Sequence, residues 1–158
     1  MTLTIPIRPA KPADHDALAD AFYKMWLDNG MTPADFAHNW KTATLGFMAE
    51  TADCNQACAF VAADGDTVVG TSQGLVSRKV YPQALKPDVR KDGYIWGVYV
   101  DPLYRRQGLA RRLTQACMDY LNSVGCTRVV LHASKSGQPV YADLGFGTTN
   151  EMRWEVPR

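Results

Sequence analysis

The chain has 158 residues, of which 46% are apolar and 21% are charged, so we expect one globular domain that spans residues 1–158. Its formal net charge of +1 argues against a nucleic-acid partner or an acidic membrane surface, and any anion site must therefore be local. No apolar run reaches the ~18–20 residues of a membrane span and the first residues show no secretory signal, so we expect a cytoplasmic protein without a membrane partner.

The first 50 residues predict one short strand followed by two helices. The strand covers Ile5–Arg8 and stops at Pro9. In Pro12–Asp28 the apolar residues recur at the spacing of an amphipathic helix, and acidic residues in its first turn favour the positive end of the helix dipole. A second helix is predicted from Thr32, which can cap it, to about Glu50, where the apolar content fades.

The middle of the chain changes to the period of β-strands. Ala57–Ala63 and Thr67–Val76 are strand-like runs, and the Asp-Gly-Asp between them is a strong hairpin signal. Residues Ser77–Gly93 contain two prolines and predict a loop. Tyr94–Val100 is aromatic and β-branched, which indicates a buried strand.

The last third of the chain predicts two more helices and two more strands. Gly108–Val124 carries its apolar residues on one side of a helix, and Gly125 is the expected C-cap. Arg128–His132 indicates a buried strand, Gly137–Leu144 a short helix and Thr148–Val156 a last strand. The resulting order, β-α-α-β-β-β-α-β-α-β, predicts an α/β fold with an open mixed sheet and helices on both faces.

The four cysteines do not indicate a metal site. Cys54 and Cys58 are spaced C-x3-C without a matching second pair, so we expect no metal. Cys117 lies on the apolar side of a predicted helix and Cys126 just after it, where buried free thiols are common. A chain of this length needs no disulfides, and reduced thiols agree with a cytoplasmic protein.

The segment from Val98 to Ala110 carries the clearest chemical signal. A strand enters a tight turn that opens directly into a helix, whose first N–H groups and partial positive charge suit a phosphate or pyrophosphate. Gly108 lets an oxyanion approach the backbone, and Ala110 is small enough not to obstruct it. Arginines surround the turn at positions 105, 106, 111 and 112. Arginines beside a helix start are also common as solvated surface, so these residues alone leave phosphate binding open.

Two blocks of the sequence resemble motifs of the GNAT acetyltransferase superfamily. Arg105-x-x-Gly108-x-Ala110 is similar to the Q/R-x-x-G-x-G/A signature with which that family holds the coenzyme A pyrophosphate. Further on, Leu131–Ser134 and Pro139–Phe146 resemble the family's second block with its Y-x-x-x-G-F ending. Because both blocks occur in the family's order and spacing, within a matching order of elements, the chain is identified as a member.

This resemblance implies a GNAT-like single domain, with a mixed, largely antiparallel sheet flanked by helices on both faces. It also implies an N-acetyltransferase that uses acetyl-CoA as acyl donor and no metal. The strand that ends at Val100 would pair with the pantetheine arm while the next strand splays away. The coenzyme-binding residues implied in this way are Val98, Tyr99, Val100, Arg105, Arg106, Gln107, Gly108, Leu109, Ala110 and Arg111. Ser134 and Ser136 are further candidates, although either could equally be a helix cap.

The resemblance implies two catalytic groups but no general base. The main-chain N–H of Val98 would polarise the thioester oxygen, as in an oxyanion hole. Tyr141 matches the family tyrosine that gives a proton to the coenzyme sulfur, and its alternative role is packing. Many relatives place a carboxylate two residues before the position of Val98, where this chain has Trp96. Glu50, Asp28, Asp53, His132 and Glu151 are other candidates, with a structural role preferred for His132, and no base is assigned.

The acceptor is expected to be a primary amine on a small molecule, an amino acid or a peptide. In the family, recognition comes from the first two helices and the loop before the coenzyme strand, which indicates Trp96, Trp26 and Glu50 as acceptor-binding residues. Trp26 also fits a helix core and Glu50 a solvated helix end. The missing carboxylate leaves one alternative, a non-catalytic acyl-CoA-binding sensor or interaction module on the same fold. Because many relatives dimerise, often through late strands, a homodimer is expected.

Overall fold

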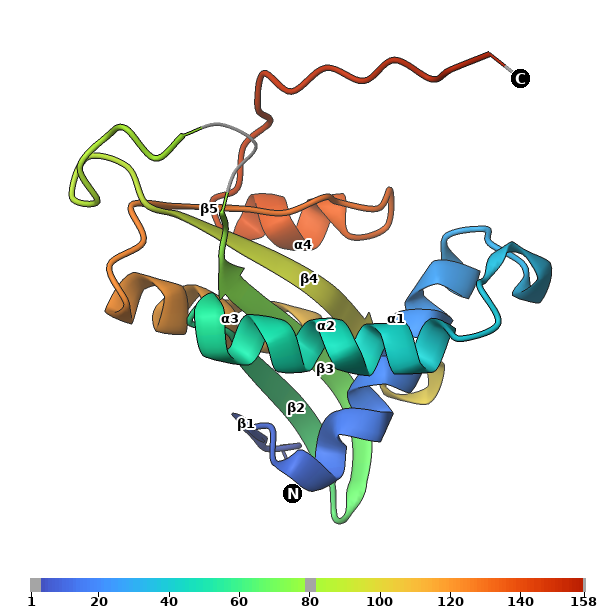
Figure 1. The fold of residues 1–158 in the computed structure, drawn as a ribbon. Coiled ribbons are helices and arrows are strands. Elements are labelled where there is room, and N and C mark those ends of the chain that lie inside the picture. Colours follow the sequence, from blue (N-terminus) through green and yellow to red (C-terminus); the bar gives the residue numbers. More distant parts are fainter. Residues whose placement is uncertain (1–3, 79–81, 158) are drawn as a thin grey trace.

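A computed structural model describes residues 4–78 and 82–157 and contains a five-stranded sheet (Figure 1). The strands lie in the order β1-β2-β3-β4-β5, in which the first four pair antiparallel and β5 runs parallel to β4. This arrangement confirms the predicted mixed, largely antiparallel sheet. The strands are β1 (Ile7–Pro9), β2 (Cys58–Asp64), β3 (Thr67–Val76), β4 (Asp92–Val100) and β5 (Arg128–Val130).

Helices cover both faces of the sheet, as predicted (Figure 1). On one face, Phe22 from the first helix and Phe47 from the second contact the ring of Trp96 in β4. On the other face, Leu113 of the third helix packs in one apolar cluster with Val100. The α-helices are α1 (His15–Asp28), α2 (Trp40–Cys54), α3 (Leu109–Ser123) and α4 (Gln138–Asp143).

The amphipathic pattern of α3 explains how closely this helix lies on the sheet. Leu109, Leu113, Cys117 and Leu121 recur every four residues and are all buried. A glycine in β4 makes room for the last of them, because a Cβ at Gly93 would lie 2.9 Å from Leu121 Cδ1. This packing fixes where α3 begins relative to the end of β4.

The second helix begins later than predicted. Thr32 and Asp35 form a 3-10 turn in which the Asp35 carboxylate accepts hydrogen bonds from the Thr32 N–H (2.7 Å) and hydroxyl (2.8 Å). Phe36 then adopts an extended backbone, which ends the turn. The helix α2 starts at Trp40, whose ring stacks on Tyr23 of α1 with 4.5 Å between centroids. The sequence signal is therefore a genuine cap, but of a short turn rather than of α2.

The start of β4 and the end of β5 also differ from the prediction. β4 begins at Asp92, two residues before the predicted start, and the buried Asp92 carboxylate accepts hydrogen bonds from Arg128 and Arg90. The ion pair with Arg128 fastens the start of β4 to β5. In contrast, β5 ends at Val130, so His132 lies beyond the paired residues. Residues 79–81 of the predicted loop lie outside the described residues.

The predicted last strand at 148–156 is wrong. These residues form an irregular segment that extends away from the sheet beyond α4 (Figure 1). Its apolar side chains alternate as in a strand, yet Met152, Trp154 and Val156 are exposed. A strand needs a neighbour to pair its backbone groups, and within residues 4–78 and 82–157 this segment has no such neighbour.

Candidate active site

The candidate site is the open edge of β4, where β5 diverges from it. The two strands pair only at Asp92–Arg128, Gly93–Val129 and Tyr94–Val130. From Ile95 to Val100, β4 continues without a β5 partner. This separation agrees with the predicted splay and leaves the backbone of residues 95–100 open on one side.

A β-bulge directs one backbone N–H into this opening. In the register of β3 and β4, Thr71 lies opposite Tyr99 and Gln73 opposite Trp96, so Ser72 faces two residues of β4. The Thr71 hydroxyl donates a 2.9 Å hydrogen bond to the Gly97 carbonyl, which fixes that peptide toward β3. The N–H of the same peptide, which belongs to Val98, then points the opposite way, because the C=O and N–H of a trans peptide are antiparallel. Gly97 has φ +62°, a conformation that favours glycine.

Beside the bulge lies Gln73, which the sequence analysis missed. Its side chain is buried, and its Nε2 has no hydrogen-bond partner within the described part of the chain. The same atom lies 3.1 Å from where a Cβ on Gly97 would stand, so it faces the bulge. The available sequence signal was a run of three polar residues, Thr-Ser-Gln, inside a strand that is otherwise buried. A buried amide without a partner marks a place where a reactant can supply one.

Past the end of β4, the chain turns into an uncapped helix N-terminus. Gly108 has φ +75° and is the N-cap of α3, which no side chain caps. The first N–H to bond within the helix is that of Arg112, to the Gly108 carbonyl at 3.1 Å. The N–H groups of Leu109, Ala110 and Arg111 precede it and are the donors that a helix start leaves unpaired. A Cβ at Gly108 would meet no atom within 4 Å, so space beside these donors is open.

The arginines around this turn divide into two groups. Arg105 donates from Nε to the Val100 carbonyl (2.9 Å) and from Nη2 to Asp28 of α1 (2.6 Å), so it holds the turn in place. Arg112 donates to the Ile5 carbonyl at 2.8 Å. Arg105 is nevertheless exposed, and the other predicted coenzyme contacts with exposed side chains at the turn are Arg106, Gln107 and Arg111.

Tyr141 lies half-buried on α4, with its ring edge-on to Phe146 at 5.9 Å between centroids. Its burial raises the pKa of the phenol, so the hydroxyl keeps its proton at neutral pH. Gly137 permits this position, since a Cβ there would lie 2.9 Å from the tyrosine ring. Ser134 accepts a 3.1 Å hydrogen bond from the Gly137 N–H and lies 3.3 Å from the Ser136 hydroxyl, so both serines shape the turn before α4.

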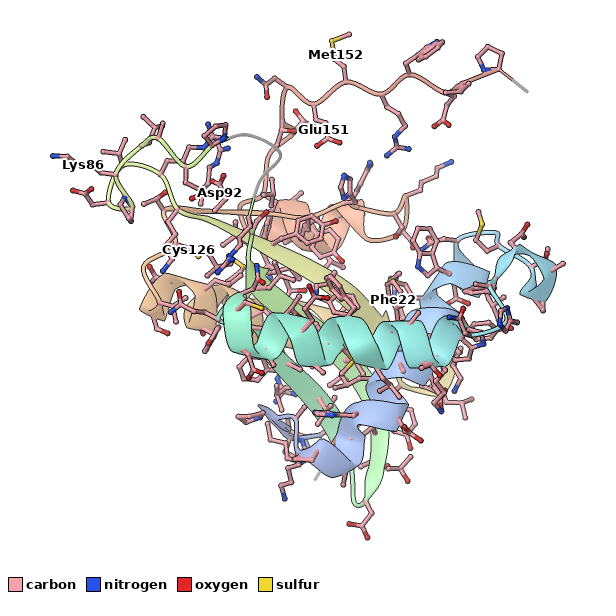
Figure 2. The ribbon with its side chains drawn as sticks, viewed as in Figure 1. Phe22, Lys86, Asp92, Cys126, Glu151 and Met152 are labelled. Atoms are coloured by element: carbon pink, nitrogen blue, oxygen red, sulfur yellow. The ribbon has the colours of Figure 1, made fainter. Side chains whose placement is uncertain are left out.

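Two of the three predicted acceptor residues, Trp96 and Trp26, belong to an aromatic group on the face of β4 that α1 and α2 cover. Trp96 makes edge contacts with Phe22 (5.1 Å between centroids) and Phe47 (5.4 Å). The partly exposed ring of Trp26 joins this group through Phe22 at 6.2 Å. Phe22 projects from α1 in Figure 2. Exposed Glu50 follows Phe47 by three residues on α2, which places both on one side of that helix.

One cysteine packs directly behind the bulge: the Cys117 thiol lies 3.0 Å from the Ser72 hydroxyl and belongs to one apolar cluster with Val98. All four cysteines are free, and the nearest pair, Cys58 and Cys117, has 3.9 Å between sulfur atoms. The hydrogen bond that Cys58 donates to Cys117, together with burial, raises the pKa of the Cys58 thiol. In the described ranges, no three histidine, cysteine or acidic side chains gather as a metal site. Nor is any helix there long and apolar enough to cross a membrane.

Comparison with known proteins agrees with this geometry. A family model described as "Acetyltransferase (GNAT) family" matches residues 15–146. A curated relative, glucosamine 6-phosphate N-acetyltransferase from Trypanosoma brucei brucei, is 40% identical over 77 residues, which are 49% of this chain and 52% of the relative. The matched part therefore spans about half the length of that curated relative.

Solved structures share the whole fold. A GCN5-related N-acetyltransferase from Ralstonia eutropha JMP134 is similar with a TM-score of 0.80 at 24% identity, covering 96% of this chain and 97% of that one. A predicted acetyltransferase from Clostridium acetobutylicum, solved with acetyl-CoA, gives a TM-score of 0.79 at 22% identity and covers 96% and 95%. At these identities the likeness establishes the fold.

Proposed function

This chain belongs to the acetyltransferase (GNAT) family, and we propose that it is an N-acetyltransferase that moves the acetyl group of acetyl-CoA onto a primary amine. The observation that carries the proposal is the junction of two open backbone sites. The edge of β4 at residues 95–100 has no β5 partner, and it leads directly to the uncapped N-terminus of α3. The first suits an extended, amide-containing arm and the second a pyrophosphate, which are parts of one coenzyme A molecule.

The residues around the turn fit such a coenzyme. The N–H groups at the start of α3, from Leu109 to Arg111, would bind the pyrophosphate, and the exposed side chains of Arg106 and Gln107 would add to them. Arg105 would act indirectly, because it already binds Val100 and Asp28. The remaining partners proposed for the coenzyme are the backbone of Val98, Tyr99 and Val100, the spacing residues Gly108 and Ala110, and the hydroxyls of Ser134 and Ser136.

Two groups of this chain would serve the transfer step. Acetyl-CoA, when bound, supplies an activated thioester. The Val98 N–H, turned away from β3 by the bulge, would stabilise the negative charge that develops on the thioester oxygen during attack. Tyr141, whose raised pKa keeps it protonated, would give its proton to the departing thiolate.

The acceptor is proposed to lie against the aromatic group formed by Trp96, Trp26 and their neighbours, with Glu50 at its rim. These rings favour an amine carried on an apolar or cationic body, on a small molecule or a peptide. The name of the curated relative suggests glucosamine 6-phosphate as a further acceptor to test. Glucosamine 6-phosphate and primary amines on an apolar or cationic body therefore form the two arms of an acceptor screen.

Titration calorimetry with acetyl-CoA, CoA and ATP, followed by thiol release with each amine, tests the proposal. We expect acetyl-CoA to bind, ATP to give little response, and at least one amine to release thiol. A Gly108→Glu variant is the matched control, because its side chain and charge would occupy the open space at the start of α3. Unchanged acetyl-CoA affinity in that variant, or no binding by the unaltered protein, would contradict the placement of the coenzyme.

A second candidate function is a non-catalytic acyl-CoA sensor on the same fold. It is favoured by one observation, the tryptophan at position 96, where many family members have a carboxylate. A sensor would bind acetyl-CoA in the calorimeter and release no thiol with any amine. The same pair of measurements therefore separates the two functions.

We also propose a cytoplasmic homodimer. Four free cysteines agree with a reducing compartment. The exposed apolar side chains of the C-terminal segment support a second copy as the partner that covers them.

A further inference from the structure

Three ionisable side chains that have no role in the proposed function lie in a row, each close to the next. The hydroxyl of Tyr94 is hydrogen-bonded to Nδ1 of His132, and Nε2 of His132 lies 3.4 Å from Oε1 of Glu151. Tyr94 belongs to β4, His132 follows β5, and Glu151 lies in the C-terminal segment, where Figure 2 labels it. The fold thus brings together three groups that are 38 and 19 residues apart in sequence.

The three hydrogen-bonded side chains lie where β4 and β5 separate. Tyr94 is the last residue of β4 that pairs with β5, opposite Val130, and His132 lies two residues beyond Val130. Because side chains alternate along a strand, Tyr94 lies on the same face as Trp96, the face that α1 and α2 cover. The side chains of His132 and Glu151 are 59% and 68% exposed, so solvent can reach them.

The hydrogen bonds among the three side chains allow a proton to move from Tyr94 to His132. When the Tyr94 hydroxyl donates to Nδ1, the neutral ring carries its proton on Nε2, which faces the Glu151 carboxylate. Burial and the charge of Glu151 raise the pKa of Tyr94, so this phenol stays protonated. A neutral imidazole backed by a carboxylate is the arrangement that stabilises an imidazolium once a proton arrives.

We propose that His132 receives, through the Tyr94 hydroxyl, the proton that the acceptor ammonium loses before it attacks the thioester. The inference rests on the proposed function. It assigns the general base, for which this protein has no carboxylate at position 96. As the ammonium N–H bond breaks, its proton goes to the Tyr94 oxygen while the Tyr94 proton moves to Nδ1 of His132. The freed lone pair attacks the thioester carbon. Tyr141 gives its proton to the departing thiolate, and the second amine proton, lost as the amide forms, reprotonates Tyr141. His132 returns its proton to solvent.

Among residues 4–78 and 82–157, the ionisable groups that contact His132 come from two elements, Tyr94 on β4 and Glu151 on the C-terminal segment. The test is therefore kcat/KM for the amine as a function of pH, at saturating acetyl-CoA, in the full-length protein. His132→Gln should lower this value about 100-fold at pH 7, because a positioned base contributes roughly 10²–10⁴-fold. The loss should shrink at alkaline pH, where free amine is abundant. Tyr94→Phe should reproduce this profile, and Glu151→Gln should give a smaller loss.

His38→Gln is the matched control, since His38 is an exposed histidine outside the site and should keep the unaltered profile. Acetyl-CoA affinity and melting temperature of His132→Gln should match those of the unaltered protein. A rate within threefold of the unaltered protein, or a loss of equal size at every pH, would overturn the proposal. If the unaltered protein transfers acetyl to no amine, the proposed function fails with it, and that outcome is recognised before any variant is made.

Discussion

Tyr141 is the side chain whose removal should lower rate without lowering affinity. Burial raises the pKa of its phenol above the usual value near 10, so it is protonated and ready to donate at neutral pH. Tyr141→Phe should lower kcat about 100-fold, the scale of one positioned acid. The ring contact with Phe146 remains, so the Kd for acetyl-CoA should change little. Steady-state kinetics and calorimetry check this, and a larger loss of affinity than of rate would contradict the acid role.

Gln73 combines a stability defect with a position beside the bulge of β4. A buried amide without a partner costs about 1–3 kcal/mol. Methionine has similar length and no such need, so Gln73→Met should raise the melting temperature by about 2–4 °C for each kcal/mol recovered. If a reactant is the missing partner, the same variant should lose about tenfold in kcat/KM, the equivalent of one hydrogen bond. Greater stability with unchanged activity would show that Gln73 does not contact the reactants.

At the scale of elements, short connections depend on a few charged contacts. β1 is fastened to the turn before α1 because Arg8 donates to both oxygens of the buried Asp14 carboxylate, at 2.6 and 3.0 Å. The Lys11 N–H donates to the same carboxylate at 2.7 Å. The hydrogen bond from Arg8, followed by the one from Lys11, lowers the pKa of Asp14 despite its burial.

The sign of this pKa shift predicts how stability depends on pH. Because the folded pKa of Asp14 lies below the unfolded value near 3.8, its stabilisation is full above that value and is lost as pH falls through the folded pKa. Asp14→Asn should lower the free energy of unfolding by about 1 kcal/mol at pH 7, since Arg8 is partly exposed. The difference between the two proteins should shrink on acidification. Urea unfolding at pH 7 and at several pH values below 3.8 measures it, and a difference that stays independent of pH there would contradict the assignment.

Across the whole molecule, the sequence predicted those elements that are determined by residues close together in the sequence. The α3 helix has a strong apolar period, and the turn before it has a short motif, so both could be placed in advance. Contacts between residues far apart in the sequence could not be predicted in this way. Arg105 binds Asp28, 77 residues away, and so holds the turn instead of pointing only at a phosphate. The run Thr-Ser-Gln marks polar residues in the strand, but it does not predict that the Gln73 amide is buried without a partner in the described part of the chain. The segment at 148–156 alternates like a strand, but pairing needs a neighbour that the pattern does not name.

The segment at 148–156 leads to a prediction about how two copies of the protein assemble. Met152, Trp154 and Val156 are 95%, 77% and 69% exposed, although fully burying one such side chain stabilises by about 1.5–3 kcal/mol. In the described part of the chain β5 is the last strand of the sheet, so its outer edge is open to an added strand. We expect the segment of one copy to pair with another copy.

Deleting residues 152–158 should therefore convert a dimer into a monomer, which light scattering after size-exclusion chromatography measures directly. Glu151 remains in this truncation, so its contact with His132 is kept and a change in mass reports on assembly alone. Trp154→Ala should weaken the dimer, whereas Arg153→Ala, on the alternate side of the extended segment, should leave it intact. A monomeric full-length protein would refute the dimer. A dimer that survives the deletion would assign the interface to another surface, because the exposed tryptophan would then have no role in holding two copies together.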